Sequence, residues 1–350
     1  MRVTAVALAL LVSPSSCLLR VSVPLSAVAP AQSHSTHSAA SLTVTATTVR
    51  AARARGGDGG RERARRARRA LIGKVHRVAR VARGGGGEEG EGILGYAASL
   101  PLLQALPPQV QTALVVNTVG FGLLEATGKR GSILTASGAL SAYLLGLVLW
   151  TALGGQGWGT CVLYLIAGSA VTKLKMAEKE SLGIAEGRGG ARGPENVWGS
   201  AATGAMCAVA SCVWPRWAGS LRIGYVASLA TKLSDTFASE VGKAYGKRTF
   251  LITTFKSVAA GTEGAVSLEG TLAGVVGSII ISGFAAAAGV VTTKALPACL
   301  IAAFVATNFE SVLGATTQGK FPWLTNEVVN FVNTVVGAGV GVGLGLACGV

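Results

Sequence analysis

Apolar residues gather in eight long runs over the C-terminal two thirds of the chain, separated by short polar or glycine-rich connections. Most runs are 17 to 24 residues long, enough for an α-helix to cross a bilayer. We therefore expect an all-α fold, a polytopic integral membrane bundle of about 7–8 transmembrane helices. The predicted spans are roughly 109–125, 132–151, 158–174, 198–215, 222–240, 268–291, 295–313 and 328–348.

Two of these spans are weaker than the rest. The first contains Asn117 and ends at Glu125, and the fifth contains Lys232 and Asp235. Small residues at helical spacing in the later spans, such as Gly270 with Gly274, indicate close helix crossings.

Positive charge supports the order of the spans. Twelve Lys and Arg residues fall in the connections of one side and three in those of the other. Such a bias is typical of membrane proteins whose spans are correctly assigned. The same side carries the two long connections, 175–197 and 241–267, so chemistry that uses charge is expected there.

Composition disfavours a soluble enzyme of two packed domains. Half of the 350 residues are hydrophobic, 13% are charged and the mean hydropathy is +0.52, whereas a soluble domain has about 25% charged residues. The six cysteines contain no C-x-x-C pair, and five fall in or beside predicted spans, where packing is their expected role.

The basic excess belongs to the N-terminal part of the chain. Residues 1–83 contain 15 Lys or Arg and 2 acidic residues, whereas residues 84–350 contain 16 and 14. Nucleic-acid binding by the body is therefore not expected. All three histidines (His34, His37 and His76) also lie there. If this part is removed, a Ser-His-Asp triad and a His-ligated zinc site are excluded.

This N-terminal part has the layout of a two-part targeting address. Residues 1–17 resemble a secretory signal, and 18–83 are rich in Ser, Thr, Ala and Arg like an organelle transit peptide. A linker, 84–108, then leads to the membrane domain, 109–348. A signal followed by a transit peptide predicts a plastid membrane. The alternative is a basic arm that remains on the protein.

Charged residues concentrate at the end of the fifth span and in the connection after it. Asp235, Glu240 and Lys243 are followed by Lys247 and Lys256. Ser267 then opens the sixth span, where free backbone N–H groups can bind an anion. Carboxylates bind Mg²⁺ and lysines neutralise phosphoryl oxygens, so the cluster suits phosphate chemistry. The alternative is a structural ion pair of Lys232 with Asp235 and an ordinary helix start at Ser267.

Five ordered motifs resemble those of a known family. They are Lys129 to Ala139, Ala185 to Val197, Ser234-Asp235-Thr236-x-Ala238-Ser239-Glu240-x-Gly242, Glu310 to Gln318, and Asn330-Phe-x-Asn333-Thr334. Together they are similar to the transmembrane protein 19 family. Asp235, Ala238, Val241 and Gly242, with Ser267 to Thr271, also resemble the core of integral-membrane lipid kinases such as dolichol kinase and phytol kinase.

The family resemblance implies an activity. Its plant members act as phytyl-phosphate kinase, making phytyl diphosphate for tocopherol synthesis in the chloroplast. The resemblance thus implies a kinase with phytyl or prenyl phosphate as acceptor in the bilayer, and with Mg²⁺ and a nucleoside triphosphate, CTP above all, as cofactors. An anionic acceptor needs no histidine base, and no P-loop motif occurs.

The resemblance also suggests roles for individual residues. Asp235 and Glu240 are predicted as catalytic metal ligands, with Glu310 as a further ligand where the family more often has Asp. The predicted nucleotide-binding residues are Lys243, Lys247, Lys256 (also a catalytic candidate), Ser267, Arg188, Arg192 and Asn196.

Two other functions use similar features. A transporter or scramblase would also need many spans and intramembrane charge, but it would spread the charge along a pathway. A lipid-phosphate cytidylyltransferase would share the acceptor and the metal but would release pyrophosphate. A noncatalytic scaffold would not need this cluster.

Overall fold

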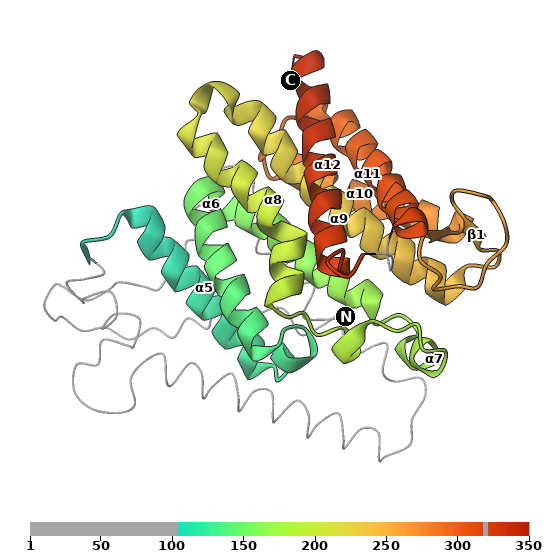
Figure 1. Cartoon of the computed structure of the whole chain (residues 1–350). Coiled ribbons are helices and arrows are strands. Elements are labelled where there is room, and N and C mark those ends of the chain that lie inside the picture. The colour runs from blue at the N-terminus through green and yellow to red at the C-terminus, as the bar shows by residue number, and fades with distance from the viewer. Residues whose placement is uncertain (1–103, 318–320, 350) are drawn as a thin grey trace, which may run out of the picture. The chain divides into compact units, whose positions relative to one another are not determined.

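The structure, a computed structural model, describes residues 104–317 and 321–349. The described part is a bundle of long helices with one two-stranded sheet (Figure 1). The predicted segments 1–17 and 18–83, and most of the linker 84–108, lie outside the described residues. The helices are α5 (Pro108–Ala126), α6 (Ala136–Thr172), α7 (Met176–Ser181), α8 (Pro194–Val213), α9 (Ala218–Tyr245), α10 (Leu268–Ala287), α11 (Leu296–Thr316) and α12 (Asn326–Ala347).

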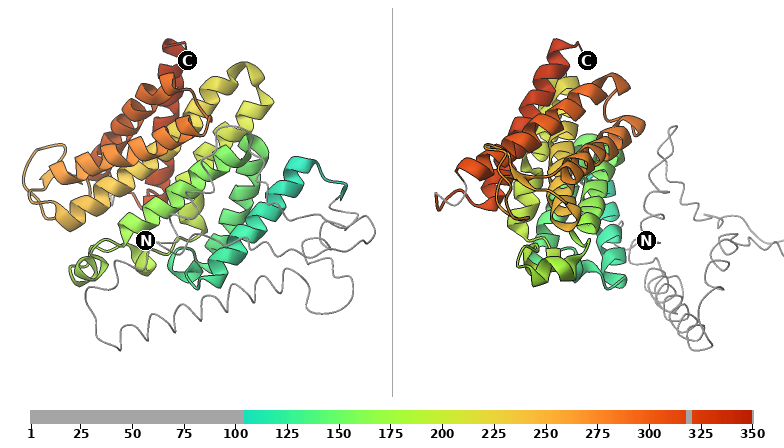
Figure 2. Two further views of the ribbon diagram at one scale, coloured as in Figure 1. Left: turned by 180° about the vertical axis from the view of Figure 1, so that it is seen from behind. Right: turned by 90° about the vertical axis from the view of Figure 1, so that its right-hand side faces the viewer.

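Helix α6 is a helical hairpin rather than one rod. A straight helix would separate Gly138 from Gly168 by about 45 Å. Yet a Cβ added to Gly138 would lie 2.2 Å from the carbonyl oxygen of Arg192, and one added to Gly168 would lie 2.8 Å from the Arg192 guanidinium. The chain reverses at Gly154, whose φ of 67° and ψ of −166° are available to glycine. The two halves match the second and third predicted spans (Figure 2).

Helix α9 lies at the centre of the bundle. Every residue from 223 to 234 is buried, which is more than three helical turns covered on all sides. Helices α8, α10, α11 and α12 all contact it. The fifth predicted span, weakened by its charges, is therefore the one that the other helices enclose.

Glycines allow two neighbours to approach α9 closely. On α10, a Cβ at Gly270 would lie 2.5 Å from the Ala238 carbonyl oxygen, and one at Gly274 would lie 3.1 Å from that of Ser234. On α12, a Cβ at Gly337 would lie 2.1 Å from the Thr231 hydroxyl. The predicted packing role of these glycines is confirmed.

The predicted all-α membrane fold is confirmed, and each predicted span coincides with a helix or, for α6, with half of one. Four helices of the described part are long and apolar enough to cross a membrane: Ala136–Thr172, Leu268–Ala287, Thr293–Thr316 and Asn326–Ala347. Helix α9 does not meet this criterion, because its apolar run is interrupted by Lys232, Asp235 and Glu240.

Hydrogen-bonding residues start several helices at one end of the bundle. Thr135 accepts from the Gly138 N–H at the start of α6, and Ser267 accepts from the Gly270 N–H at the start of α10. Two connections gather at this end. One contains α7, and the other contains the antiparallel pair β1 (Phe250–Leu251) and β2 (Ala265–Val266). These connections are the two that the sequence analysis assigned to the charged side.

Candidate functional site

A polar cavity of about 220 Å³ lies where the two long connections meet the helix ends. Helices α8, α9, α11 and α12 and both connections contribute lining residues. Of the predicted site residues, the lining set contains Asp235, Glu240, Lys243, Ser267, Arg192, Asn196 and Glu310. The fold thus brings together residues that are up to 118 positions apart in sequence, from Arg192 to Glu310.

Asp235 is held by a buried lysine one turn before it. The Lys232 ammonium donates to Asp235 Oδ2 and to Asn330 Oδ1 of α12, both at 2.5 Å. The side chains of Lys232 and Asp235 are only 7% and 16% exposed. The ion pair weighed as the structural alternative therefore exists, but it borders the cavity, so its groups also face whatever occupies that space.

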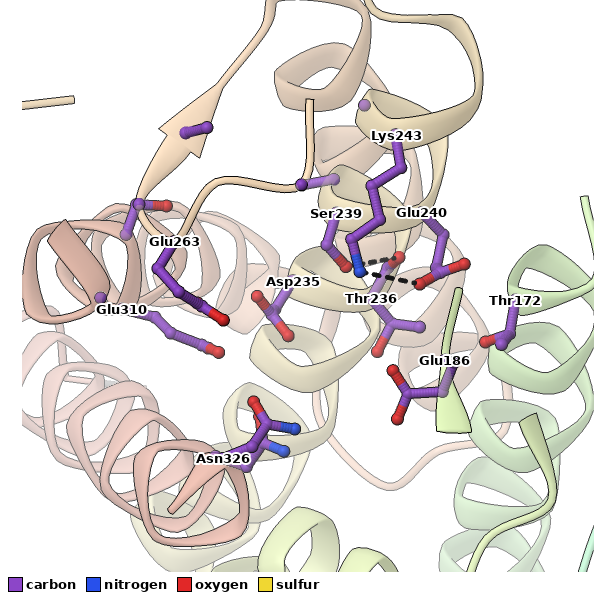
Figure 3. A pocket seen from close by; sticks show the side chains of 18 of the residues that line it. Thr172, Glu186, Asp235, Thr236, Ser239, Glu240, Lys243, Glu263, Glu310 and Asn326 are labelled. Carbon is purple, nitrogen blue, oxygen red and sulfur yellow. Dashed lines mark hydrogen bonds and ion pairs between the residues drawn. The ribbon is translucent and has the colours of Figure 1, made fainter. Parts of the chain in front are cut away.

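A second carboxylate approaches Asp235 from α11. Glu310 lines the same cavity as Asp235 and accepts a hydrogen bond from the Asn333 side-chain amide. Figure 3 shows Asp235, Glu310 and Glu263 pointing into the same part of the cavity. Glu263 comes from the connection that precedes α10.

The carboxylates fit a magnesium ion that shares its ligands with phosphate. Within the described residues, no set of three His, Cys, Asp or Glu side chains could hold a metal alone. Mg²⁺ is usually bound by one or two carboxylates, with waters and substrate phosphates completing its octahedron. Asp235 and Glu310 line one cavity, and a divalent cation bound by both carboxylates would offset their like charges.

Glu240 has a different environment from Asp235, although both are on α9. The Lys179 ammonium of α7 donates to Glu240 and to the Thr172 carbonyl oxygen. Lys243 lies on the other side, 3.6 Å from Glu240. The Lys179 and Glu240 side chains are 1% and 4% exposed. Glu240 is thus tied to two lysines, while Asp235 and Glu310 form the carboxylate pair.

The connection between α6 and α8 contributes Arg192 to the lining, and the first turn of α8 contributes Asn196. Arg192 donates to the Tyr164 hydroxyl at 2.6 Å, in the space that Gly168 leaves open. Asn196 accepts from the Gly193 N–H at the start of α8. Arg188, in contrast, is exposed and pairs with Glu195. That hydrogen bond lowers the pKa of the Glu195 carboxyl.

Of the remaining residues predicted to bind the nucleotide, one lines the cavity and two lie outside its lining. Ser267 caps α10, as expected of an ordinary helix start, and it also lines the cavity, as expected of a ligand-binding residue. Lys247 and Lys256 are exposed on the connection that contains β1, outside the cavity lining.

Three residues at the cavity end of the bundle were not predicted as catalytic or ligand-binding residues: Lys179, Glu263 and Lys232. Lys179 lies in a polar stretch with acidic neighbours at 178 and 180, which gives no sign of burial. Glu263 is an isolated acid in a glycine-rich connection, and nothing in the sequence marks it as a site residue. In the structure it lines the cavity beside Asp235 and Glu310. Lys232 was placed as a pairing residue and is also a lining residue.

A helical bundle with apolar outer faces and a polar cavity at one end defines a multi-pass integral membrane protein. The chain belongs to the family described as integral membrane protein DUF92, whose model matches residues 120–338. This finding confirms the family resemblance of the motifs.

Three relatives show how widely the domain occurs. The chain is 51% identical over 230 residues to an uncharacterized membrane protein, sll0875, of Synechocystis sp., covering 65% of this chain and 88% of the relative. It is 43% identical over 256 residues to Protein VTE6, chloroplastic, of Arabidopsis thaliana, covering 71% and 75%. It is 31% identical over 225 residues to an uncharacterized membrane protein, MJ0933, of Methanocaldococcus jannaschii, covering 64% and 91%. No solved structure matches.

Proposed function

We propose that this protein is a membrane-embedded kinase that phosphorylates an isoprenoid monophosphate, phytyl phosphate in the first place, with CTP as phosphoryl donor. The observation that carries the proposal is the carboxylate pair Asp235 and Glu310, beside Lys232 and Lys243, in one cavity at the charged end of a membrane bundle. The motifs shared with phytyl-phosphate kinases and the 43% identity to Protein VTE6, chloroplastic, support it.

The proposed reaction needs charge neutralisation and alignment rather than a protein base. An oxygen of the acceptor phosphate attacks the γ-phosphorus of the nucleotide in line. The new P–O–P bond forms on the lipid as the bond from the γ-phosphorus to the β–γ bridging oxygen breaks, and the nucleoside diphosphate leaves with that electron pair. The acceptor is already an anion, so no proton must be removed. This is consistent with a cavity whose lining contains no histidine.

The cavity residues divide these tasks. Asp235 and Glu310 would hold Mg²⁺, which neutralises phosphate charge and orients the donor. Lys243 and Lys232 would contact phosphoryl oxygens from the α9 side, and the Asn330 and Asn333 amides orient Lys232 and Glu310. Free N–H groups at the start of α10, beside Ser267, add further donors for an anion.

We also propose a plastid membrane as the location. The two-part N-terminal address supports it, and so does a relative whose printed name places it in the chloroplast.

The test uses full-length protein in liposomes with Mg²⁺, phytyl phosphate and CTP, analysed by mass spectrometry. Phytyl diphosphate with CDP is the expected product pair. A CDP-linked lipid with pyrophosphate would instead make the protein a cytidylyltransferase. Absence of any product with every nucleotide and prenyl phosphate would contradict the kinase.

The Asp235→Asn variant tests whether the reaction takes place at the cavity that Asp235 lines. It keeps the size of the side chain but removes the charge, so turnover should fall about a hundredfold or more while membrane insertion is retained. Glu178→Gln is the matched control, because this carboxylate is 57% exposed on α7, outside the cavity. Full activity of Asp235→Asn would remove the central assignment.

A further inference from the structure

A second, smaller cavity continues from the first toward the surface of the bundle. It has a volume of about 70 Å³ and shares six lining residues with the larger cavity: Asp235, Ala238, Ser239, Ala265, Ser267 and Ser311. Its floor is α9 and its two walls are α10 and α11. We call it the α10–α11 groove.

The charged residue of the groove lies at one end and its largest apolar side chains lie at the other. At the end shared with the large cavity lie Asp235, Ser267 and Ser311, and at the other end lie Val275 and Phe304, with Ser278 one turn further along α10. Ser311 and Phe304 are separated by about 10 Å along α11. Between these ends are Thr271, Thr307 and Asn308.

The apolar end of the groove reaches the outer surface of the bundle. Val275 and Phe304 line the groove and are also 37% and 51% exposed. Their neighbours Val276, Ile279 and Ile301 are each 50% exposed and apolar, as expected of surfaces that contact lipid. The groove therefore joins the lipid-facing surface of two membrane-spanning helices to the charged cavity.

One polar atom of a residue that lines the groove lacks a partner among the described residues. The Thr307 hydroxyl oxygen is buried and has no hydrogen-bond partner among the described residues. Most other hydroxyls of the walls are satisfied by their own helix, as when Ser278 donates to the Val275 carbonyl and Thr271 to that of Ser267. A buried hydroxyl without a partner costs free energy unless a ligand or a water binds it.

We propose that the α10–α11 groove holds the acceptor lipid phosphate, which reaches it sideways from the bilayer. Its phosphate lies at the Asp235, Ser267 and Ser311 end, with its ester oxygen level with Thr307. Its first isoprenoid carbons lie between Val275 and Phe304, and the rest of the chain stays in the bilayer. This assignment rests on the proposed kinase function and adds the acceptor subsite to it.

Photolabelling tests the location without depending on turnover. Full-length protein in liposomes is irradiated with a prenyl monophosphate that carries a diazirine in its first isoprene unit, and the labelled peptides are identified by mass spectrometry. Adducts are expected on α10 or α11 near Val275 and Phe304. Excess phytyl phosphate should compete, and phytol, which lacks the phosphate, should compete much less. Adducts confined to α5, α6, α8 or α12, or equal competition by phytol, would overturn the proposal.

A matched pair of substitutions tests the groove in turnover. Val275→Trp narrows the groove, whereas Val276→Trp adds the same side chain one position along α10, on an exposed residue outside the lining. We expect Val275→Trp to raise KM for phytyl phosphate by about tenfold and to leave KM for the nucleotide unchanged. Val276→Trp should change neither. Equal effects of the two substitutions would overturn the groove assignment.

The two experiments separate this inference from the kinase proposal. Competable labelling in the groove of a protein that makes no diphosphate would retain the acceptor site and reject the kinase. Normal diphosphate production with labelling elsewhere would retain the kinase and reject the groove as the acceptor site.

Discussion

The ion pair of Lys179 and Glu240 joins the surface helix α7 to the centre of the bundle. Both side chains are almost completely buried, and Lys179 also donates to the last turn of α6 at Thr172. A buried charge that loses its partner is strongly destabilising, because its solvation is not replaced. This pair therefore fixes the connection that contributes Arg192 to the cavity.

Removing one partner of this pair should destabilise the protein. Lys179→Met leaves Glu240 buried without its main partner and should cost about 3–5 kcal/mol. The measurement is the temperature at which half of the detergent-solubilised protein is lost from the monodisperse peak. Combining Lys179→Met with Glu240→Gln should recover much of the loss.

The control is Lys175→Met on the same segment. Lys175 is 37% exposed and pairs with the exposed Glu178, so its replacement should change thermal stability very little. If both lysine variants behaved alike, the burial of Lys179 would not be what stabilises this end of the bundle.

At the residue scale, the sequence predicted the members of the cavity better than their partners. Asp235, Lys243 and Ser267 were found by charge and by position at a helix end, and Glu310 was found by the family resemblance of its motif. All four line one cavity. The pairing of Lys232 with Asp235, three positions apart, was anticipated, but long-range pairing could not be predicted, because Glu240 pairs with a lysine 61 positions away and Asp235 shares its cavity with an acid 75 positions away. Local patterns contain no information on contacts of that range.

At the scale of elements, the hairpin within α6 depends on one glycine. Two apolar halves of similar length are joined at Gly154 without an intervening loop, and the reversal uses backbone angles in which a Cβ would clash. The neighbouring contact of Trp150 with Trp158, at 5.5 Å between ring centroids, packs the two halves together at the turn.

Gly154→Ala should therefore weaken the protein. The strained backbone is expected to cost about 1–3 kcal/mol, seen as a lower temperature of thermal inactivation. Gly283→Ala provides the comparison, since Gly283 is inside α10 and an added Cβ would meet nothing within 4 Å. That variant should be neutral or slightly more stable, because alanine favours helix. A neutral Gly154→Ala would mean that the turn adopts other angles.

The sequence predicted where the long helices lie, but it did not predict the short elements between them. The apolar runs locate the helices because hydrophobic length is a strong signal. Helix α7 and the strands β1 and β2 were not predicted, since elements of two to six residues carry too little pattern. The reversal at Gly154 left a gap between two runs, which is why two spans were expected where the helical conformation is almost continuous.

At the scale of the whole membrane domain, charge and chemistry share one side. Helix α12 begins at Asn326 in the cavity lining and ends at Ala347, about 33 Å further along its axis. Among the described connections, those at the cavity end contain most of the Lys and Arg residues, which predicts that this end stays on the side from which the protein is inserted.

Labelling of single cysteines can test this sidedness. Cys348 is exposed beyond the end of α12, and Lys256→Cys would place a thiol on the exposed connection at the cavity end. A membrane-impermeant maleimide added to sealed vesicles should label one of the two positions and not the other, as read from the modified peptides. Detergent should expose both. Labelling of both from one side in sealed vesicles would contradict the arrangement.

The central position of α9 also has a consequence for how the protein is made. Its charged residues Lys232, Asp235 and Glu240 are unfavourable in lipid until other helices surround them. Three of the helices that enclose it, α10, α11 and α12, follow it in the chain and leave the ribosome later. Stable residence of α9 in the bilayer therefore has to wait for segments not yet synthesised. In a nascent chain that stops after Tyr245, a cysteine placed in α9 should react with a water-soluble maleimide, whereas in one that extends through Ala347 it should be protected.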